Sequence, residues 1–189
     1  MASVRLRTES ADQWWYSMRK MGTSFSQITA EQAALIRASK VFFVASVAED
    51  LSTGPDGQGP VNLSPKGGVP LHVIDPNRVA YLDYTGSGNQ TARHALSGGP
   101  VTLMVMSMDG DNAAIVRIYG RATVMAVEDS PLADRLLADP AVSIELPVRQ
   151  VVDVAVSGTQ TSCGYGVPVF DYVGQRVRAQ RGRRFKQAI

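Results

Sequence analysis

Short apolar runs separated by turn residues follow one another closely along this chain, and this pattern limits the folds that it can adopt. The run KVFFVASVA (40–48) is continuous and rich in β-branched and aromatic residues, which is typical of a buried strand. Similar strand-like runs follow at 61–67, 73–85, 98–110, 113–127 and within 151–174. Five or six closely spaced strands with few helices favour an antiparallel barrel or sandwich over alternating βαβ units. We expect closure into a barrel, because closure leaves no sheet edge exposed.

Helix signals are few. Thr29 and Gln32 have the spacing of a capping box before the amphipathic stretch AALIRASK, and Ser130 precedes a proline at the start of SPLADRLLADP (130–140). Gly120 lies inside the strand-like run 113–127, where glycine usually marks a bulge or bend. These residues predict two helices and one irregular strand. The fold class is therefore mainly β (α+β), with a few peripheral helices.

The composition suits one soluble domain. The chain has 189 residues, of which 44% are hydrophobic and 19% charged, so a packed core is expected. It has one cysteine, no secretory h-region and no apolar run of about 18 residues, which favours a cytoplasmic protein without a membrane span. Residues 176–186 carry six cations and no acid, which leaves the rest of the chain at −4. This basic tail could bind nucleic acid non-specifically, but a solvated terminus is the simpler interpretation, and nucleic acid is not an expected partner.

The stretch LDYTGSGNQTARHAL (82–96) places short hydrogen-bonding side chains where a strand becomes a helix. Its two glycines allow backbone N–H groups to face a ligand, and Arg93 adds a charge. This arrangement could hold a phosphate. It could equally be a turn in which Ser87 or Asn89 caps the helix, and caps are more common than phosphate sites. The residues alone leave both interpretations open.

The strand-like run VNLSPKG (61–67) has Asn62, Ser64 and Lys66 at period-two positions, so these side chains share one face of a regular strand. An amide, a hydroxyl and an ammonium on one face suit an anionic or heteroaromatic ligand. An ordinary solvated strand face explains the same pattern. Arg117 likewise could reach an interior ligand or pair with an acid at the surface.

Other reactive residues form no recognisable motif. Cys163, in TSCGYG, could be a nucleophile, but His72 and His94 lie in no local motif with it, and a free cysteine is more often a small buried hydrophobe. One cysteine and two histidines show no metal-ligand spacing, so no metal site is expected.

The order of these segments, from VFFVAS through VNLSPKG, YLDYTGSGN, VTLM and RIYGRATV to SCGYGVPVFDYVG, resembles the pyridoxamine 5'-phosphate oxidase-like family of flavin-binding split β-barrels. The resemblance covers roughly residues 25–175. It implies a six-stranded antiparallel split barrel that forms a homodimer and binds FMN at the subunit interface. Residues 1–22 show no clear period and are expected to be an N-terminal leader that could be loosely ordered, and the cations near the end mark a basic C-terminal tail (176–189). The FMN-binding domain that the resemblance implies is then 23–175.

The resemblance places the FMN phosphate in the strand-to-helix turn and the flavin ring and ribityl chain along VNLSPKG, and so favours the phosphate interpretation of that turn. The implied cofactor-binding residues are Asn62, Ser64, Lys66, Gly67, Thr85, Ser87, Asn89, Thr91, Arg93 and Arg117.

The chain departs from the family pattern at one point that bears on function. Members with oxidase activity usually have Ser-Arg-Lys where this chain has Asn89, Gln90 and Thr91. Two cations that would face a phosphate are therefore missing, and Lys66, Arg93 or Arg117 would have to compensate. Without compensation, the deazaflavin F420 becomes the alternative cofactor.

The function that the resemblance implies is a flavin-dependent oxidoreductase acting on a small molecule. Pyridoxamine phosphate is not the expected substrate, because the C-terminal tryptophan and arginine segment of true oxidases is absent. The alternative is a non-catalytic carrier or sensor of a flavin, F420 or a haem-type ligand.

Overall fold

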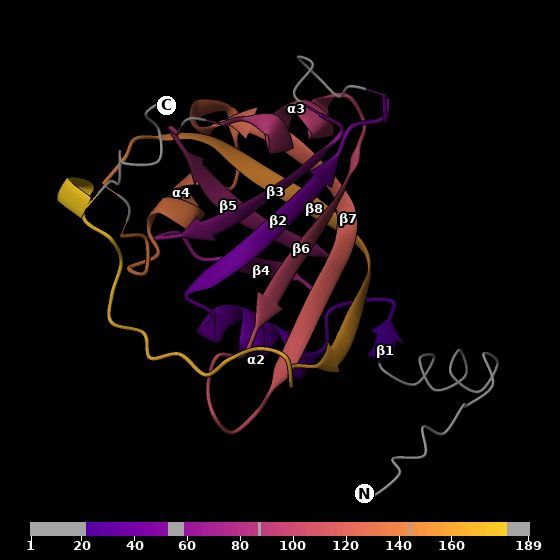
Figure 1. Ribbon diagram of the computed structural model, residues 1–189. Coiled ribbons are helices and arrows are strands. Elements are labelled where there is room, and N and C mark those ends of the chain that lie inside the picture. Colours follow the sequence, from indigo (N-terminus) through magenta and orange to yellow (C-terminus); the bar gives the residue numbers. More distant parts are fainter. Residues whose placement is uncertain (1–21, 53–58, 87, 144, 181–189) are drawn as a thin grey trace, which may run out of the picture.

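The computed structural model describes residues 22–52, 59–86, 88–143 and 145–180. These residues form eight strands, three α-helices and two 3-10 turns (Figure 1). The strands are β1 (Gly22–Phe25), β2 (Val41–Val47), β3 (Val61–Gly67), β4 (His72–Asp75), β5 (Arg78–Tyr84), β6 (Pro100–Met106), β7 (Ala114–Ala126) and β8 (Val148–Cys163). The helical elements are α2 (Ala30–Ala38), α3 (Gln90–Leu96), η2 (Val127–Asp129), α4 (Ala133–Leu137) and η3 (Arg178–Gln180).

All strands belong to one antiparallel sheet with the order β3-β2-β6-β7-β8-β5-β4, and β1 adds to β8. The mainly antiparallel β fold expected from the sequence is confirmed, but two details are wrong. The sheet has eight strands rather than six, because a turn at Asp75–Arg78 divides the run 73–85 into β4 and β5, and because β1 was not anticipated. Within the described residues the sheet also does not close, since no backbone pairing joins β3 to β4 or β5. Side chains span that gap instead, as shown below.

The two longest strands curve across the sheet and depend on one irregularity. The register between β7 and β8 shifts between Tyr119 and Gly120, which is the bulge that the sequence predicts. A side chain at Gly120 would collide with the backbone carbonyl of Ala155 on β8. Glycine is therefore required there by the close approach of the two backbones.

The helices cover the ends of the curved sheet: α2 lies at one end and α3 at the other (Figure 1). The predicted capping box of α2 is confirmed, because Thr29 N–H donates to Gln32 Oε1 (3.0 Å) and Gln32 N–H donates to Thr29 Oγ1 (3.2 Å). The second predicted helix is shorter than expected. Leu132 occupies the N-cap position of α4, and Ser130 lies in the preceding turn, where its Oγ accepts from Leu132 N–H (3.3 Å).

The core lies inside the curve of the sheet, where alternate residues of each strand point inward. Its largest fully buried side chains include Tyr81, Ile36, Leu82, Leu103, Ile118 and Leu136. The Phe42 and Tyr81 rings pack edge to face, with centroids 5.1 Å apart. No described helix has the length and apolar character needed to cross a bilayer.

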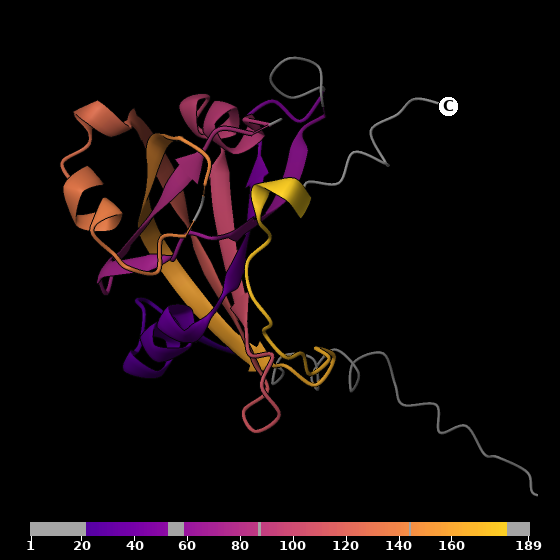
Figure 2. The ribbon, with the colours of Figure 1, turned by 90° about the vertical axis from the view of Figure 1, so that its left-hand side faces the viewer.

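After β8 the chain runs without regular structure beside β2 and β3 to η3 (Figure 2). This segment is held by Phe170 N–H, which donates to Met108 O (3.1 Å), and by Lys40 Nζ, which lies 5.9 Å from the centroid of the Tyr172 ring. Of the expected leader and basic tail, residues 1–21 and 181–189 lie outside the described part of the chain.

Candidate functional site

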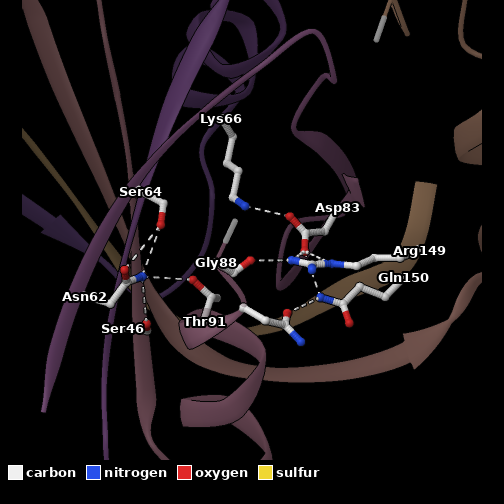
Figure 3. Close-up of polar contacts among 10 residues, drawn as sticks. Ser46, Asn62, Ser64, Lys66, Asp83, Gly88, Thr91, Arg149 and Gln150 are labelled. Atoms are coloured by element: carbon white, nitrogen blue, oxygen red, sulfur yellow. Dashed lines mark hydrogen bonds and ion pairs between the residues drawn. The ribbon is translucent and has the colours of Figure 1, made fainter. Parts of the chain in front are cut away.

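A polar cavity of about 220 Å³ lies where β3, the end of β5, the turn before α3 and the start of β8 meet. Side chains from these four segments face one another there (Figure 3). The residues that line it are Ser64, Lys66, Asp83, Tyr84, Gly86, Gly88, Asn89, Gln90, Thr91 and Arg149. They are distant in sequence, and the gap left between β3 and β5 brings them together.

Asp83 is the centre of the polar contacts at this cavity. Its Oδ1 accepts from Lys66 Nζ (2.6 Å), and its Oδ2 accepts from Arg149 Nη2 (2.9 Å) and from Gln150 Nε2 (2.7 Å). The side chains of Lys66 and Asp83 are 14% and 6% exposed, and that of Arg149 is 23% exposed. One nearly buried carboxylate therefore holds two cations, so these three groups carry a net charge of +1 (Figure 3).

The electrostatic balance at Asp83 favours its charged form. Burial alone would raise its pKa, but attraction to Lys66 and hydrogen bonds from Lys66, Arg149 and Gln150 outweigh burial and lower the pKa below its usual value. Burial, and the nearby Asp83 charge, raise the pKa of the Tyr84 phenol. At neutral pH the cavity wall thus combines an aspartate, two cations and a neutral phenol.

The start of β8 also fixes the glycine-rich turn. Arg149 Nη2 donates to Gly88 O (2.7 Å), and Gln150 Nε2 donates to Asn89 Oδ1 (2.9 Å). Asn89 occupies the N-cap position of α3, but its side chain makes no capping hydrogen bond. Its amide oxygen is used by Gln150 instead, so the structure does not support a turn capped by Asn89.

A cluster of hydroxyl groups lies beside the cations. Asn62 Nδ2 donates toward Ser64 Oγ (3.1 Å), Thr91 Oγ1 (3.2 Å) and Ser46 Oγ (3.4 Å), and so links β3 to β2 and α3 (Figure 3). Ser46 Oγ also lies 3.0 Å from His94 Nδ1. Ser64 and Thr91 line the cavity, whereas Asn62 lies behind them and holds their hydroxyls.

The structure places only some of the residues expected to bind a cofactor at this cavity. It brings Ser64, Lys66, Asn89 and Thr91 together at the cavity, with Asn62 directly behind them. The others lie elsewhere or are not described. Thr85 is exposed, with its N–H donating to Pro147 O (2.9 Å). Arg93 lies on α3 but does not line the cavity, and Ser87 lies outside the described residues.

The last two of these residues lie on other parts of the sheet. Gly67 borders a different cavity of about 370 Å³, beneath Phe170 and Tyr172. Arg117 lies on β7 and donates to Ser162 Oγ (3.0 Å). Near it, Cys163 is exposed at the end of β8, and its sulfur accepts from Tyr165 N–H (3.4 Å).

Five polar residues at or behind the cavity were not anticipated: Asp83, Arg149, Gln150, Ser46 and His94. Asp83 had a signal in the sequence, because an acid within the otherwise apolar strand RVAYLDY requires a partner when buried. Arg149 and Gln150 immediately precede the apolar run of β8 and showed no local motif. Their role depends on the antiparallel pairing of β8 with β5, which places Gln150 opposite Asp83.

Comparison with known proteins places this chain in a family. The family model described as pyridoxamine 5'-phosphate oxidase matches residues 28–163. The chain is 33% identical over 124 residues to the pyridoxamine 5'-phosphate oxidase family protein ustO from Aspergillus flavus. That alignment covers 64% of this chain and 49% of the relative, so the chain spans about half the length of the curated protein that it matches.

Solved structures agree with the family model. A candidate pyridoxamine 5'-phosphate oxidase from Lactobacillus delbrueckii superposes with a TM-score of 0.51 at 25% identity, over 71% of this chain and 94% of that one. An FMN-binding protein from Syntrophomonas wolfei has the same fold, with a TM-score of 0.51 at 15% identity, over 78% and 90% of the two chains. This protein belongs to the pyridoxamine 5'-phosphate oxidase family.

Proposed function

We propose that this protein binds FMN, with the phosphate in the cavity between Lys66 and Arg149, and acts as a flavin-dependent oxidoreductase. The observation that supports this proposal is the convergence of two cations with Ser64, Asn89 and Thr91 on one small cavity. Lys66 and Arg149 would supply the two cations that are missing where Asn89, Gln90 and Thr91 replace the usual Ser-Arg-Lys triplet. FMN is therefore favoured over F420.

The donors left at the cavity suit a phosphate. Lys66 has three N–H donors and gives one to Asp83, while Arg149 uses Nε and Nη2 on Asp83 and Gly88. Two hydrogens of Lys66 Nζ and those of Arg149 Nη1 therefore remain available to donate to a ligand. Because Asp83 holds both cations in place, an incoming phosphate would meet donors that are already oriented, and charge-assisted hydrogen bonds of this kind are the stronger ones.

The chain's own residues would bind and orient the cofactor. A bound flavin supplies the hydride chemistry, while the protein determines its position and electronic surroundings. Ser64 and Lys66 occupy alternate positions on the inward face of β3 and both line the cavity, so both would face the phosphate end of the cofactor. We assign the flavin-binding domain to residues 23–175.

We further propose that the protein is a homodimer that shelters the cofactor. The outward face of β3 exposes Val61 and Leu63 to 69% and 66%, which is unusual for apolar side chains on a sheet. A second copy of the chain covering this face would remove them from water.

Titration of FMN into the purified protein, followed by flavin fluorescence, tests the proposal. We expect strong quenching with FMN and much weaker binding of riboflavin, which lacks the phosphate. F420 serves as the second cofactor in the same assay. Binding of F420 in preference to FMN, or equal binding of FMN and riboflavin, would contradict the assignment of the cavity to the FMN phosphate.

A second experiment separates an oxidoreductase from a carrier. The FMN-loaded protein is photoreduced and mixed with oxygen or a quinone, and the oxidised protein is mixed with NAD(P)H. An oxidoreductase transfers electrons faster than free FMN under the same conditions, whereas a carrier does not.

A further inference from the structure

We propose that His94 and Ser46 are positioning residues that prepare Ser64 and Thr91 to donate hydrogen bonds to an anion in the cavity. This inference rests on the proposed function, because it concerns how the same cavity recognises a phosphate. Neither residue lines the cavity, and the sequence assigned neither of them a role in binding. Both are almost completely buried, with His94 1% and Ser46 3% exposed.

Asn62 has fewer amide hydrogens than hydroxyl neighbours. Its amide nitrogen carries two hydrogens but lies within hydrogen-bond distance of three hydroxyl oxygens, those of Ser64, Thr91 and Ser46. The contact with Ser46 is the longest of the three, at 3.4 Å. Asn62 therefore cannot serve all three hydroxyls at once, and the division of its hydrogens depends on what else each hydroxyl contacts.

His94 affects which hydroxyls receive the two amide hydrogens of Asn62. In the described part of the chain, the Ser46 hydroxyl contacts His94 Nδ1 at 3.0 Å as well as Asn62. His94 Nε2 is buried and has no hydrogen-bond partner among the described residues, which favours the tautomer with the proton on Nδ1, because a proton on Nε2 would be left unpaired. Nδ1–H then donates to the buried Ser46 hydroxyl, so Asn62 is able to give both of its hydrogens to Ser64 and Thr91. Without the imidazole, the Ser46 hydroxyl would be buried with Asn62 as its remaining partner and would compete for one amide hydrogen.

The Ser64 and Thr91 hydroxyls can then donate to a ligand in the cavity. A hydroxyl that accepts a hydrogen bond from Asn62 keeps its own O–H hydrogen for another acceptor. Ser64 Oγ lies 3.5 Å from Asn62 Oδ1, which is too long for that oxygen to hold the hydroxyl hydrogen strongly. Two hydroxyls with hydrogens to donate, beside Lys66 and Arg149, form a site for an anionic oxygen rather than for a cation.

The test uses the variants His94→Leu, Ser46→Ala and the double variant, with FMN and riboflavin as ligands. His94→Leu should raise the dissociation constant for FMN by about tenfold, the loss expected for one hydrogen bond to a charged group. Riboflavin binding should be unchanged, because that ligand has no phosphate. Adding Ser46→Ala to His94→Leu should restore FMN binding, since the competing hydroxyl is then absent, and Ser46→Ala alone should bind FMN like the unmodified protein.

Restored FMN binding in the double variant would distinguish a positioning role from a packing defect. If His94→Leu acted by leaving a cavity in the core, the further loss of the Ser46 hydroxyl would not repair it. His94→Asn, whose amide can reach the Ser46 hydroxyl, should retain FMN binding. His72→Leu is the matched control, because His72 is the chain's other histidine and contacts Asp139 (3.6 Å) away from the cavity. FMN binding by His72→Leu should be unchanged.

If His94→Leu does not fold, NMR of the histidine ring nitrogens in the unmodified protein tests the positioning role. Inorganic phosphate should shift those of His94 and leave those of His72 unchanged. Loss of FMN binding in Lys66→Ala together with full binding in His94→Leu, or an unshifted His94 signal, would overturn the positioning role and leave the proposed function intact. An unmodified protein that binds neither FMN nor phosphate would overturn both.

Discussion

Lys66 and Asp83 form an ion pair of 2.6 Å that joins β3 to β5 across the open side of the sheet, where the described strands share no backbone hydrogen bonds. Arg149 adds a second cation to the same carboxylate from β8. The sheet is therefore held at its gap by side chains, and the same side chains form the wall of the polar cavity. In the function that we propose, stability of the gap and recognition of the phosphate depend on the same residues.

The first prediction concerns the carboxylate at the centre of this network. Asp83→Asn keeps the shape of the side chain but leaves Lys66 and Arg149 close together without a negative charge between them. We expect the free energy of unfolding to fall by about 3 kcal/mol, as is typical when one partner of a buried ion pair is removed. Urea denaturation of the ligand-free protein measures this change.

Asp153→Asn is a matched control for that experiment. Asp153 pairs with one cation, Arg78, whose side chain is 39% exposed, whereas Asp83 holds two less exposed cations, so loss of the Asp153 charge should cost less, about 1 kcal/mol. Equal destabilisation by the two substitutions would show that the Asp83 network contributes no more than an ion pair with a single, partly exposed cation.

The second prediction is the dependence of stability on pH. The pKa of Asp83 is lower in the folded protein than its unfolded value of about 4. Its contribution is therefore fully present above pH 5 and is lost as the pH falls from about 4 through the folded pKa. The difference in unfolding free energy between the unmodified protein and Asp83→Asn should shrink over this range and stay constant between pH 5 and pH 7. A difference that does not change below pH 4 would contradict the ionic role of Asp83.

Local signals in the sequence predicted local structure well. The Thr29 and Gln32 capping box, the bulge at Gly120 and the apolar runs of β2, β3, β6 and β7 each depend on interactions within a few residues or on strand patterning. The mainly antiparallel β fold followed from these runs and from the turns between them. The family resemblance is likewise confirmed by the family model over residues 28–163.

The closure of the sheet and the composition of the cavity depend on contacts between distant residues. Asp83 and Arg149 are separated by 66 positions, and no spacing rule connects them. The sequence indicated that Ser64, Lys66, Asn89 and Thr91 could contact a ligand, but it could not show which cations accompany them. The sequence pointed to Arg117 as a cation that could reach a ligand and not to Arg149, whereas the structure places Arg149 at the cavity and Arg117 beside Ser162.

The third prediction tests the two cations in FMN binding. Lys66→Met and Arg149→Met each remove charge-assisted donors while retaining an apolar chain of similar length. Each should weaken FMN binding at least about tenfold, with little change for riboflavin. Flavin fluorescence titration measures both dissociation constants.

The control for these substitutions is Arg37→Met, which removes an exposed cation from the last turn of α2, at the end of the sheet opposite α3 (Figure 1). It should leave FMN binding unchanged. If Arg37→Met weakens binding as much as Lys66→Met, the attraction comes from the overall charge of the protein rather than from the cavity.

The fourth prediction concerns the exposed apolar face of β3. Leu63→Glu places a charge where we propose that a second copy of the chain packs, and a charge buried in an apolar interface without a partner is costly. The unmodified protein should sediment as a dimer and Leu63→Glu as a monomer. Leu51→Glu is the matched control, because Leu51 is 65% exposed, close to the 66% of Leu63, but lies outside the sheet. It should leave the dimer intact.

A monomeric unmodified protein, or a Leu63→Glu variant that remains dimeric, would exclude this face as the subunit interface. If the interface shelters the cofactor, Leu63→Glu should also weaken FMN binding although Leu63 does not line the polar cavity.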